Sequence, residues 1–558
     1  MNVLQKPLRI NGYKANFFTD DDTLLTILKE KLPHDFYHYA IEQLTLYGKK
    51  CATDIDARAK YTDRDGQPRL QRYNQFGEEV SEVWVNEGYE KTVSESYQTG
   101  MVGYVHKDIP ELNQKGNYLY SFALGYLVSQ TDPGFYCPVT LTMATAYLLE
   151  NYANDEVKQR FLPHVCATGD TDLFEGATFL TERQGGSDVG ANVVAAVHDG
   201  DHYRLYGEKY FASNAGRCGV AMVLARREGA PAGTKGLTLF AVPWNGEDGK
   251  RNKLRIRRLK DKLGVRSVPS GEVEFDGSVA YVVGDETRGF YYMMEALNLS
   301  RICNAVASIG IMRRAYEEAR HYAEARHAFG QSLLQLPMIR QTLAGLKAKL
   351  EVEVAAVFDL IHLYDKVAAG EASENEVILH RLYIAILKKE SAEMAIHFSH
   401  EAIEMHGGNG YIEDFVTPRL LRDAQVLTVW EGTANILGQE LIRLVKKFSA
   451  HTLFLTEMKA RLSALQHTEL IMMVNEQLNT VEEKLHQFAQ ADAHIQQTEA
   501  KSLMQQLAYL YESVVALEWA AKNGEQYEAL AEIYLEETWQ TRTFGKQSKA
   551  NEYASQFL

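Results

Sequence analysis

The spacing of hydrophobic residues changes twice along the chain, and each change marks a different kind of structure. Up to about residue 172, apolar residues recur every three or four positions, for example in Leu24–Leu28 and Phe36–Leu44. This period is typical of amphipathic helices. Pro138–Tyr152 and Asp155–Leu162 continue the pattern, although the turn-rich stretch Tyr61–Pro68 interrupts it. The first part of the chain is therefore predicted to be mainly helical.

From about Gly176 the apolar residues form short or alternating runs separated by turn residues, as expected for β-strands. The runs are Ala177–Thr181, Val193–Val197, Tyr203–Tyr206, Ala221–Ala225, Leu237–Val242 and Glu272–Phe275. The helical period returns near Gly289. It predicts helices over Met293–Ala325, Pro337–Ala369, Ala372–Met405 and Ile436–Phe448, with further amphipathic helices such as Lys501–Lys522.

These changes predict an α+β protein with four domains. Residues 1–174 would form a mostly helical domain, 175–286 a β domain, 287–446 a helical bundle, and 447–558 an additional helical domain. The helices of the bundle are expected to pack antiparallel.

The composition of the chain disfavours several classes of function. With 59 Lys and Arg against 74 Asp and Glu, the 558-residue chain has a net charge of −15, which disfavours adventitious binding to nucleic acid or anionic membrane. Five scattered cysteines without a CxxC pair indicate neither a disulfide framework nor a thiolate metal site. Met1–Asn11 show no export signal and no 18-residue apolar run occurs, so a cytoplasmic protein without a membrane span is expected.

Common cofactor and metal motifs are missing from the sequence. There is no G-x-G-x-x-G dinucleotide fingerprint and no G-x-x-x-x-G-K-[ST] phosphate loop. His400-Glu401 begins like a zinc motif, but Glu404 stands where the second histidine would be. No metal site is therefore predicted, and any nucleotide would need another kind of scaffold.

Two stretches in the β domain are candidate ligand sites. Leu180–Val189 is a glycine-rich polar turn whose amides and hydroxyls could hold a phosphate or the polar edge of a ring; alternatively it is a surface turn. In Lys209–Asn214, Phe211 could cover a ring while Ser213, on the same side of the strand, bonds its edge. The alternative is a core phenylalanine beside a turn.

Two stretches in the helical region complete the set. Arg326–Gly330 offers a cation and an aromatic ring at a helix end, suited to a pyrophosphate and a base; alternatively the charge complements the helix dipole. Thr428–Asn435 offers Glu431 beside Trp430 and Gly432. Glu431 could be a proton-abstracting base, because a carboxylate in an apolar pocket gains basicity, or a plain acid favoured at a helix start.

Taken in order, these stretches resemble the acyl-CoA dehydrogenase family, with matching motifs from about Pro138 to Val445. The family pattern is L-T-E-x-x-x-G-S-D, K-x-[WF]-x-[ST]-N, R-x-x-F-G, G-G-x-G-[YF] and [WY]-E-G-[TS]. This chain supplies Leu180–Asp188, Lys209–Asn214, Arg326–Gly330, Gly407–Tyr411 and Trp430–Thr433. The resemblance implies a helical domain, a middle β-barrel or sandwich, and a four-helix bundle, here followed by an extra helical domain.

The resemblance also implies FAD as cofactor, acyl-CoA as substrate and electron-transfer flavoprotein as acceptor. The residues that it assigns to FAD are Thr181, Gln184, Ser187, Phe211, Ser213, Arg326, Phe329, Gly407, Gly408, Trp430, Gly432, Thr433 and Asn435. Ser187, Arg301 and Trp430 would contact the substrate, and Glu431 would be the base that removes its α-proton. Some relatives place the base just before the equivalent of Arg301; here that residue is Ser300, so Glu431 is the candidate.

The length of the chain and several short segments indicate to which branch of the family the resemblance extends. Tyr73–Gly77, Cys137–Thr142, Gln184–Asp188 and Arg258–Gly264 resemble the AidB-like branch, which contains an alkylation-response flavoprotein credited with DNA binding. Residues 441–558 carry 11 Lys or Arg against 15 Asp or Glu, which disfavours a DNA groove. A dehydrogenase, assembled as a homotetramer, is thus preferred over a DNA-binding flavoprotein with weak or vestigial activity.

Overall fold

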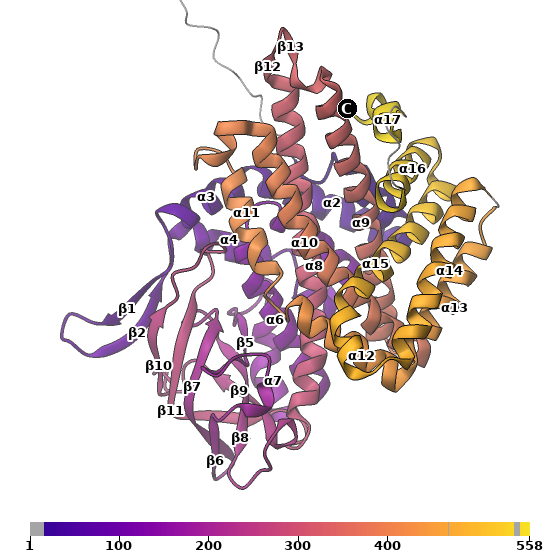
Figure 1. The fold of residues 1–558 in the computed structure, drawn as a ribbon. Helices are drawn as coiled ribbons and strands as arrows, with labels where there is room; N and C mark the ends of the chain where they lie inside the picture. The colour runs from indigo at the N-terminus through magenta and orange to yellow at the C-terminus, as the bar shows by residue number, and fades with distance from the viewer. Residues whose placement is uncertain (1–15, 467, 541–546) are drawn as a thin grey trace, which may run out of the picture. The chain divides into compact units, whose positions relative to one another are not determined.

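The computed structural model describes residues 16–466, 468–540 and 547–558 (Figure 1). Its contacts divide these residues into two compact units: Pro33–Cys303, and Asn304–Leu558 together with the described residues up to Leu32. The expectation about Met1–Asn11 concerns residues outside the described ranges. Within those ranges, no helix is both long and apolar enough to cross a bilayer.

The Pro33–Cys303 unit begins with a group of helices, as the apolar spacing predicts. They are α2 (His34–Lys50), α3 (Asp56–Arg64), α4 (Glu87–Tyr97), α5 (Tyr118–Ser129), α6 (Pro133–Tyr152) and α7 (Asp155–Val165). Every residue of α5 is buried, which explains why its sequence is apolar on all sides. The Asp132 side chain accepts a hydrogen bond from the Phe135 amide at 2.9 Å, and Pro133 fills the first helical position, so α6 starts sharply.

A β-hairpin interrupts these helices directly after the turn-rich stretch Tyr61–Pro68. Strands β1 (Arg69–Tyr73) and β2 (Glu79–Trp84) pair antiparallel and project from the helices of their unit (Figure 1). The Asn74 carboxamide oxygen accepts from the Phe76 and Glu78 amides and closes the turn. A second small pair joins β3 (Asp108–Ile109) to β4 (Gln114–Lys115).

The same unit contains a seven-stranded sheet that closes on itself. Its strands are β5 (Gly176–Phe179), β6 (Ala195–Asp199), β7 (His202–Ser213), β8 (Val220–Arg227), β9 (Leu237–Pro243), β10 (Leu254–Leu259) and β11 (Ser270–Val282). The order is β10-β11-β7-β6-β8-β5, and β9 pairs with both β8 and β11. The ring β11-β7-β6-β8-β9 is therefore a small barrel, which confirms the predicted β domain.

Strand β10 is not anticipated by the sequence because its outward positions are arginines. Leu254 and Ile256 point inward and are buried, whereas Arg255 and Arg257 lie on the other face. Arg257 bonds Glu274 of the neighbouring strand β11 and also pairs with Glu208 of β7. This arginine-rich segment forms a strand because its arginines make cross-strand ion pairs, although its composition alone would predict a loop.

The other unit is a helical bundle with further helices packed against it. Helix α8 (Gly289–Ala325) crosses the boundary between the units. The remaining bundle helices are α9 (Pro337–Ala368), α10 (Glu374–His406), α11 (Thr417–Leu427) and α12 (Ala434–Phe448), with α1 (Asp22–Lys31) packed on α9. The extension adds α13 (Ala450–Ser463), α14 (Glu469–Gln490), α15 (Ala493–Asn523), α16 (Glu525–Trp539) and α17 (Lys549–Phe557).

A buried cluster around Lys349 joins the extension to the bundle. Lys349 of α9 pairs with Glu353 of the same helix at 3.2 Å, with Glu390 of α10 at 3.0 Å and with Glu512 of α15 at 2.7 Å. All three glutamates are fully buried. Burial, together with the neighbouring carboxylates, raises the pKa of Glu353 well above its usual range, against the pull of the Lys349 ammonium.

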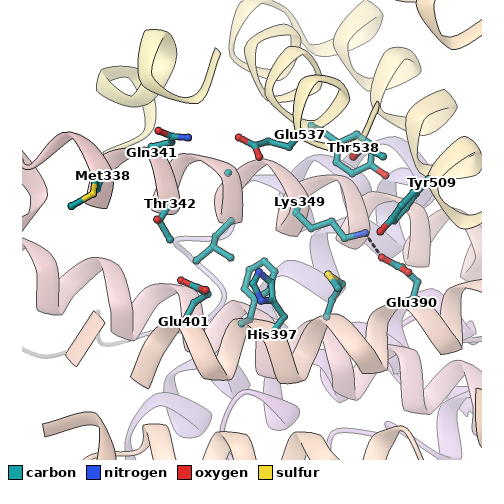
Figure 2. Close-up of a pocket in the computed structure, with 15 residues that line it drawn as sticks. Met338, Gln341, Thr342, Lys349, Glu390, His397, Glu401, Tyr509, Glu537 and Thr538 are labelled. Atoms are coloured by element: carbon teal, nitrogen blue, oxygen red, sulfur yellow. Dashed lines mark hydrogen bonds and ion pairs between the residues drawn. The ribbon is translucent and has the colours of Figure 1, made fainter. Parts of the chain in front are cut away.

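The cluster lies at one end of a cavity of about 700 Å³ among α9, α10, α15 and α16. Figure 2 shows Lys349 and Glu390 at that end and Met338 at the other. None of the site residues predicted from the sequence lines this cavity. Its position shows that the extension packs directly on the bundle core through α15 and α16.

We expect Lys349→Met to destabilise this unit by about 3–5 kcal/mol, because three buried carboxylates would lose their shared cation. Lys459→Met is the matched control, since Lys459 pairs with Glu482 between α13 and α14 at a half-exposed position and should cost under about 1 kcal/mol. Urea unfolding followed by circular dichroism measures both. Equal midpoints for the two variants would contradict the role of the cluster.

Another buried carboxyl lies in the Pro33–Cys303 unit, just before β5. Glu175 is buried beside Tyr97, whose hydroxyl donates to its Oε1 at 3.3 Å. Burial raises the pKa of Glu175 to about 7, against the opposing pull of Arg217 and Tyr97. In the unfolded chain the same carboxyl ionises near pH 4.5. The folded protein therefore loses stability as pH rises from about 4.5 through 7.

Glu175→Gln should remove this pH dependence, since the amide does not ionise. A pKa of about 7 in the folded chain against 4.5 in the unfolded chain corresponds to about 3 kcal/mol, so the variant should gain about that much relative to the natural chain between pH 4.5 and pH 8. Glu90→Gln, at a half-exposed ion pair with Arg217, is the control and should change little. The free energy of unfolding of both variants and of the natural chain is measured by urea unfolding at pH 4.5 and pH 8. If it changes with pH in Glu175→Gln as much as in the natural chain, the assignment of the pH dependence to Glu175 is refuted.

Candidate active site

The loop Leu180–Asp188 leaves β5 and is fastened to strand β7. The Tyr210 amide donates to the Thr181 carbonyl at 2.9 Å. The Glu182 carboxylate is buried and bonds the Lys209 ammonium at 2.8 Å and the Val193 amide at 2.7 Å. The structure thus brings together two motifs that are more than twenty residues apart in the sequence.

Lys209 itself is fully buried, and sequence analysis did not identify its role. Its ammonium also donates to the Leu180 carbonyl at 3.2 Å. Burial lowers the pKa of Lys209 to about 8, while the neighbouring Glu182 carboxylate acts in the opposite direction. The sequence gives no direct signal of this buried ion pair, because plain alternation would place Lys209 on the same face as Phe211.

The glycine-rich part of the loop exposes polar groups to solvent. A Cβ at Gly186 would lie 2.5 Å from Thr181 Oγ1, so a larger residue there would displace the Thr181 hydroxyl. Gln184 is exposed and donates to the Asn192 carboxamide oxygen at 2.9 Å, and Ser187 is exposed beyond it. This arrangement fits the hypothesis of a polar cradle and leaves hydroxyl groups accessible.

A bulge in β7 decides which side chains face outward. Ala212 pairs with Gly271 and Lys209 with Val273, so β7 has one residue more than β11 in this interval. Lys209 and Ala212 both point inward as a result, while Phe211 and Ser213 share the other face. Phe211 is 55% exposed, and the Lys260 ammonium lies 4.9 Å from its ring centre.

Glu431 lies in the turn between α11 and α12. Its φ is 60°, a left-handed conformation that is rare outside glycine, and Gly432 follows with φ 104°. Trp430 and Glu431 are half-buried, while Thr433 and Asn435 at the start of α12 are exposed. Glu431 therefore precedes the helix and lies outside it. A strained backbone at a polar residue favours the functional hypothesis over a simple helix-start acid.

Two bundle residues hold this turn, and sequence analysis named neither of them. Lys388 of α10 donates from Nζ to the Gly432 carbonyl at 2.9 Å. Asn304 of α8 donates to the carbonyl of Leu427, the last residue of α11, at 3.2 Å. The turn is thus bonded to the bundle at both ends.

The Arg326 motif and the Gly407 motif come together at the end of α8. Arg326 is followed by a small hairpin of β12 (His327–Ala328) and β13 (Gln331–Ser332). Phe329 at its tip has φ 52° and is 93% exposed. The Asn409 carboxamide, beside the exposed Gly407 and Gly408, donates to the Tyr322 hydroxyl of α8 at 3.0 Å.

Arg301 lies on the part of α8 that belongs to the Pro33–Cys303 unit. It is buried, and its guanidinium donates to the Asn298 side chain at 3.1 Å. Ser300 beside it is also buried and offers no carboxylate. Among the described residues, no group of His, Cys, Asp or Glu has the arrangement of a metal site.

Comparison with known proteins identifies three matching families along the chain. Residues 287–445 match "Acyl-CoA dehydrogenase, C-terminal domain" and residues 177–278 match "Acyl-CoA dehydrogenase, middle domain". Residues 11–169 match "Adaptive response protein AidB N-terminal domain". The three matches follow one another along the chain.

Individual relatives extend over most of the chain. It is 31% identical to acyl-CoA dehydrogenase family member 11 of Caenorhabditis elegans, over 77% of this chain and 70% of that one. It is 32% identical to the putative acyl-CoA dehydrogenase AidB of Escherichia coli, over 80% of both chains. The solved structure of Caenorhabditis elegans ACDH-11 in complex with C11-CoA superposes with a TM-score of 0.85 at 27% identity, over 96% of this chain and 94% of that one.

Glu182→Gln should destabilise the protein by about 3–5 kcal/mol, because it leaves the buried Lys209 ammonium without its carboxylate. The neighbouring Arg183→Gln is the control: Arg183 is an exposed partner of Glu208 and should cost under about 1 kcal/mol. The purified variants are compared by urea unfolding and by bound flavin per chain. If Glu182→Gln unfolds at the same urea concentration as the control, the buried pair does not fasten the loop.

Proposed function

Because the chain belongs to the acyl-CoA dehydrogenase family of FAD-dependent oxidoreductases, in its AidB-like branch, we propose that it oxidises an acyl-CoA thioester to the trans-2-enoyl form using Glu431 as base. The observation that carries the residue assignment is the turn between α11 and α12, which presents a half-buried carboxylate from a left-handed backbone. The proposed acceptor of the electrons is electron-transfer flavoprotein.

The residues of the β domain suit the ring of FAD. Phe211 offers an exposed aromatic face, and Ser213 on the same face of β7 offers a hydroxyl. Thr181 and Gln184 offer polar groups for the ring edge, and Ser187 would reach the phosphates or the thioester end. Bound FAD would supply the acceptor for the hydride that leaves the β-carbon.

The helical unit offers groups for the rest of the cofactor. Arg326 and Phe329 extend from the end of α8, and an exposed aromatic ring such as Phe329 suits a site that is completed by another chain. We propose that they, with Gly407 and Gly408, bind the adenosine-pyrophosphate of a neighbouring subunit's FAD. Trp430, Gly432, Thr433 and Asn435 would contact the cofactor near Glu431. A shared site implies an oligomer, which we propose to be a tetramer.

Glu431 would act by removing the proton on the α-carbon of the thioester. That proton is weakly acidic, so the developing negative charge on the thioester oxygen needs hydrogen-bond donors, for which the Glu431 amide is a candidate. Burial of the acyl chain would expel water from around the carboxylate and raise its basicity. Ser300 has no acidic group, so it does not compete for this role.

The substrate is proposed as an acyl-CoA of medium chain length. The relative ACDH-11 was solved with C11-CoA, and undecanoyl-CoA is therefore the first compound to test. Arg301, Ser187 and Trp430 are the residues proposed to contact the substrate.

A DNA-binding role is less well supported. Two cations of the extension are paired with acids of the extension: Arg461 with Glu518 at 2.5 Å and Lys549 with Glu532 at 2.8 Å. A groove for DNA needs a row of available positive charges.

Glu431→Gln should retain FAD and lose reduction of the flavin by acyl-CoA by about 10²–10⁴-fold, the usual contribution of a general base. The measurement is anaerobic bleaching of the yellow protein by undecanoyl-CoA and a chain-length series. Glu440→Gln is the control, because Glu440 on α12 bonds Arg443 of the same helix. Unchanged bleaching in Glu431→Gln would remove Glu431 from the mechanism. A natural chain that no acyl-CoA bleaches would refute the proposed function.

A further inference from the structure

Lys388 is a buried lysine in the middle of a bundle helix. Its side chain is about 1% exposed, and it lies on α10 after the apolar run Leu382–Leu387. Burying an ammonium is unfavourable unless hydrogen bonds replace its water. Its Nζ bonds the Gly432 carbonyl, which belongs to the residue directly after Glu431.

The turn around Glu431 has a backbone that needs support from outside. A non-glycine residue with φ 60° is sterically disfavoured, and Gly432 with φ 104° is a conformation that other residues adopt only with strain. After Leu427 the chain turns, with the Val429 and Trp430 amides both donating to the Val426 carbonyl. These bonds fix the entrance to the turn, whereas the Lys388 bond fixes its exit.

We propose that Lys388 is a positioning residue: its bond to the Gly432 carbonyl holds the Gly432–Thr433 peptide, and with it the exit of the turn, in the orientation that presents the Glu431 carboxylate to the substrate. This inference rests on the proposed function for the role of Glu431. The holding of the turn itself is a property of the folded chain and is measurable without any substrate.

The bond is well suited to this task because it is charge-assisted and buried. An ionised donor makes a stronger hydrogen bond than a neutral one, and the surrounding low dielectric strengthens it further. Lys388 belongs to a 33-residue helix packed on α9, α11 and α12, so its backbone is a rigid support. A turn held in this way keeps its carboxylate in place while the substrate binds.

Lys388→Met and Lys388→Gln separate the bond from the bulk of the side chain. Methionine preserves the volume and removes the donor, whereas glutamine keeps a donor that is shorter and uncharged. Lys389→Met is the matched control, because Lys389 is also buried but bonds Glu393 one turn further along α10, at 2.8 Å. All three variants are made in the full-length flavoprotein.

Hydrogen–deuterium exchange of a peptide covering 428–435 is the first readout. We expect at least about tenfold faster exchange in Lys388→Met than in the natural chain, intermediate exchange in Lys388→Gln, and no change in Lys389→Met. If Lys388→Met does not fold, the comparison rests on Lys388→Gln. Unchanged exchange at this peptide would overturn the inference, whatever the enzyme's activity.

Kinetics provide the second readout, which a merely structural role would not produce. At saturating undecanoyl-CoA the bleaching rate of Lys388→Met should fall about 10–100-fold, while FAD content and the dissociation constant for acyl-CoA stay unchanged. Partial recovery in Lys388→Gln would support the role of the donor. Faster exchange with an undiminished bleaching rate would refute the positioning role but leave the proposed function intact.

Discussion

Buried lysine ammonium groups that bond loop residues recur in both units of this protein. Lys209 fastens the loop after β5 through Glu182 and the Leu180 carbonyl, and Lys388 bonds the carbonyl of Gly432 in the turn after α11. Each ammonium is shielded from water, and the hydrogen bonds that it makes to the loop replace part of its lost hydration. Because a buried cation without hydrogen bonds is unfavourable, each lysine favours the loop conformation in which these bonds are made.

This arrangement explains how irregular segments can carry candidate functional groups without losing precision. Loops are less restrained than helices or strands, yet binding and catalytic residues are concentrated on them. Here the irregular segments are short and are bonded to a barrel strand in one unit and to bundle helices in the other. The strand and the helices are rigid, and a few side-chain hydrogen bonds fix the position of the loops relative to them.

The sequence predicts the order of elements well because apolar spacing reports directly which face of a helix or strand is buried. It does not predict β10, whose outward arginines depend on glutamates of other strands. The shared face of Phe211 and Ser213 follows from alternation, but the inward position of Lys209 requires a bulge that alternation does not encode. Lys388 was missed because a Lys-Lys pair in a helix resembles a solvated surface, and only its apolar neighbours indicate burial.

The Lys349 cluster has a consequence for how this long form can change over evolutionary time. Lys349 of the bundle and Glu512 of the extension are buried against each other, and Tyr511 donates to Asp359 of α9 at 2.7 Å. Deleting the extension would expose the apolar surface of α9 and α10 and remove a partner from a buried charge. A chain with this packing can therefore lose the extension without losing stability only if several substitutions on α9 and α10 replace the exposed apolar residues and the unpaired buried charge.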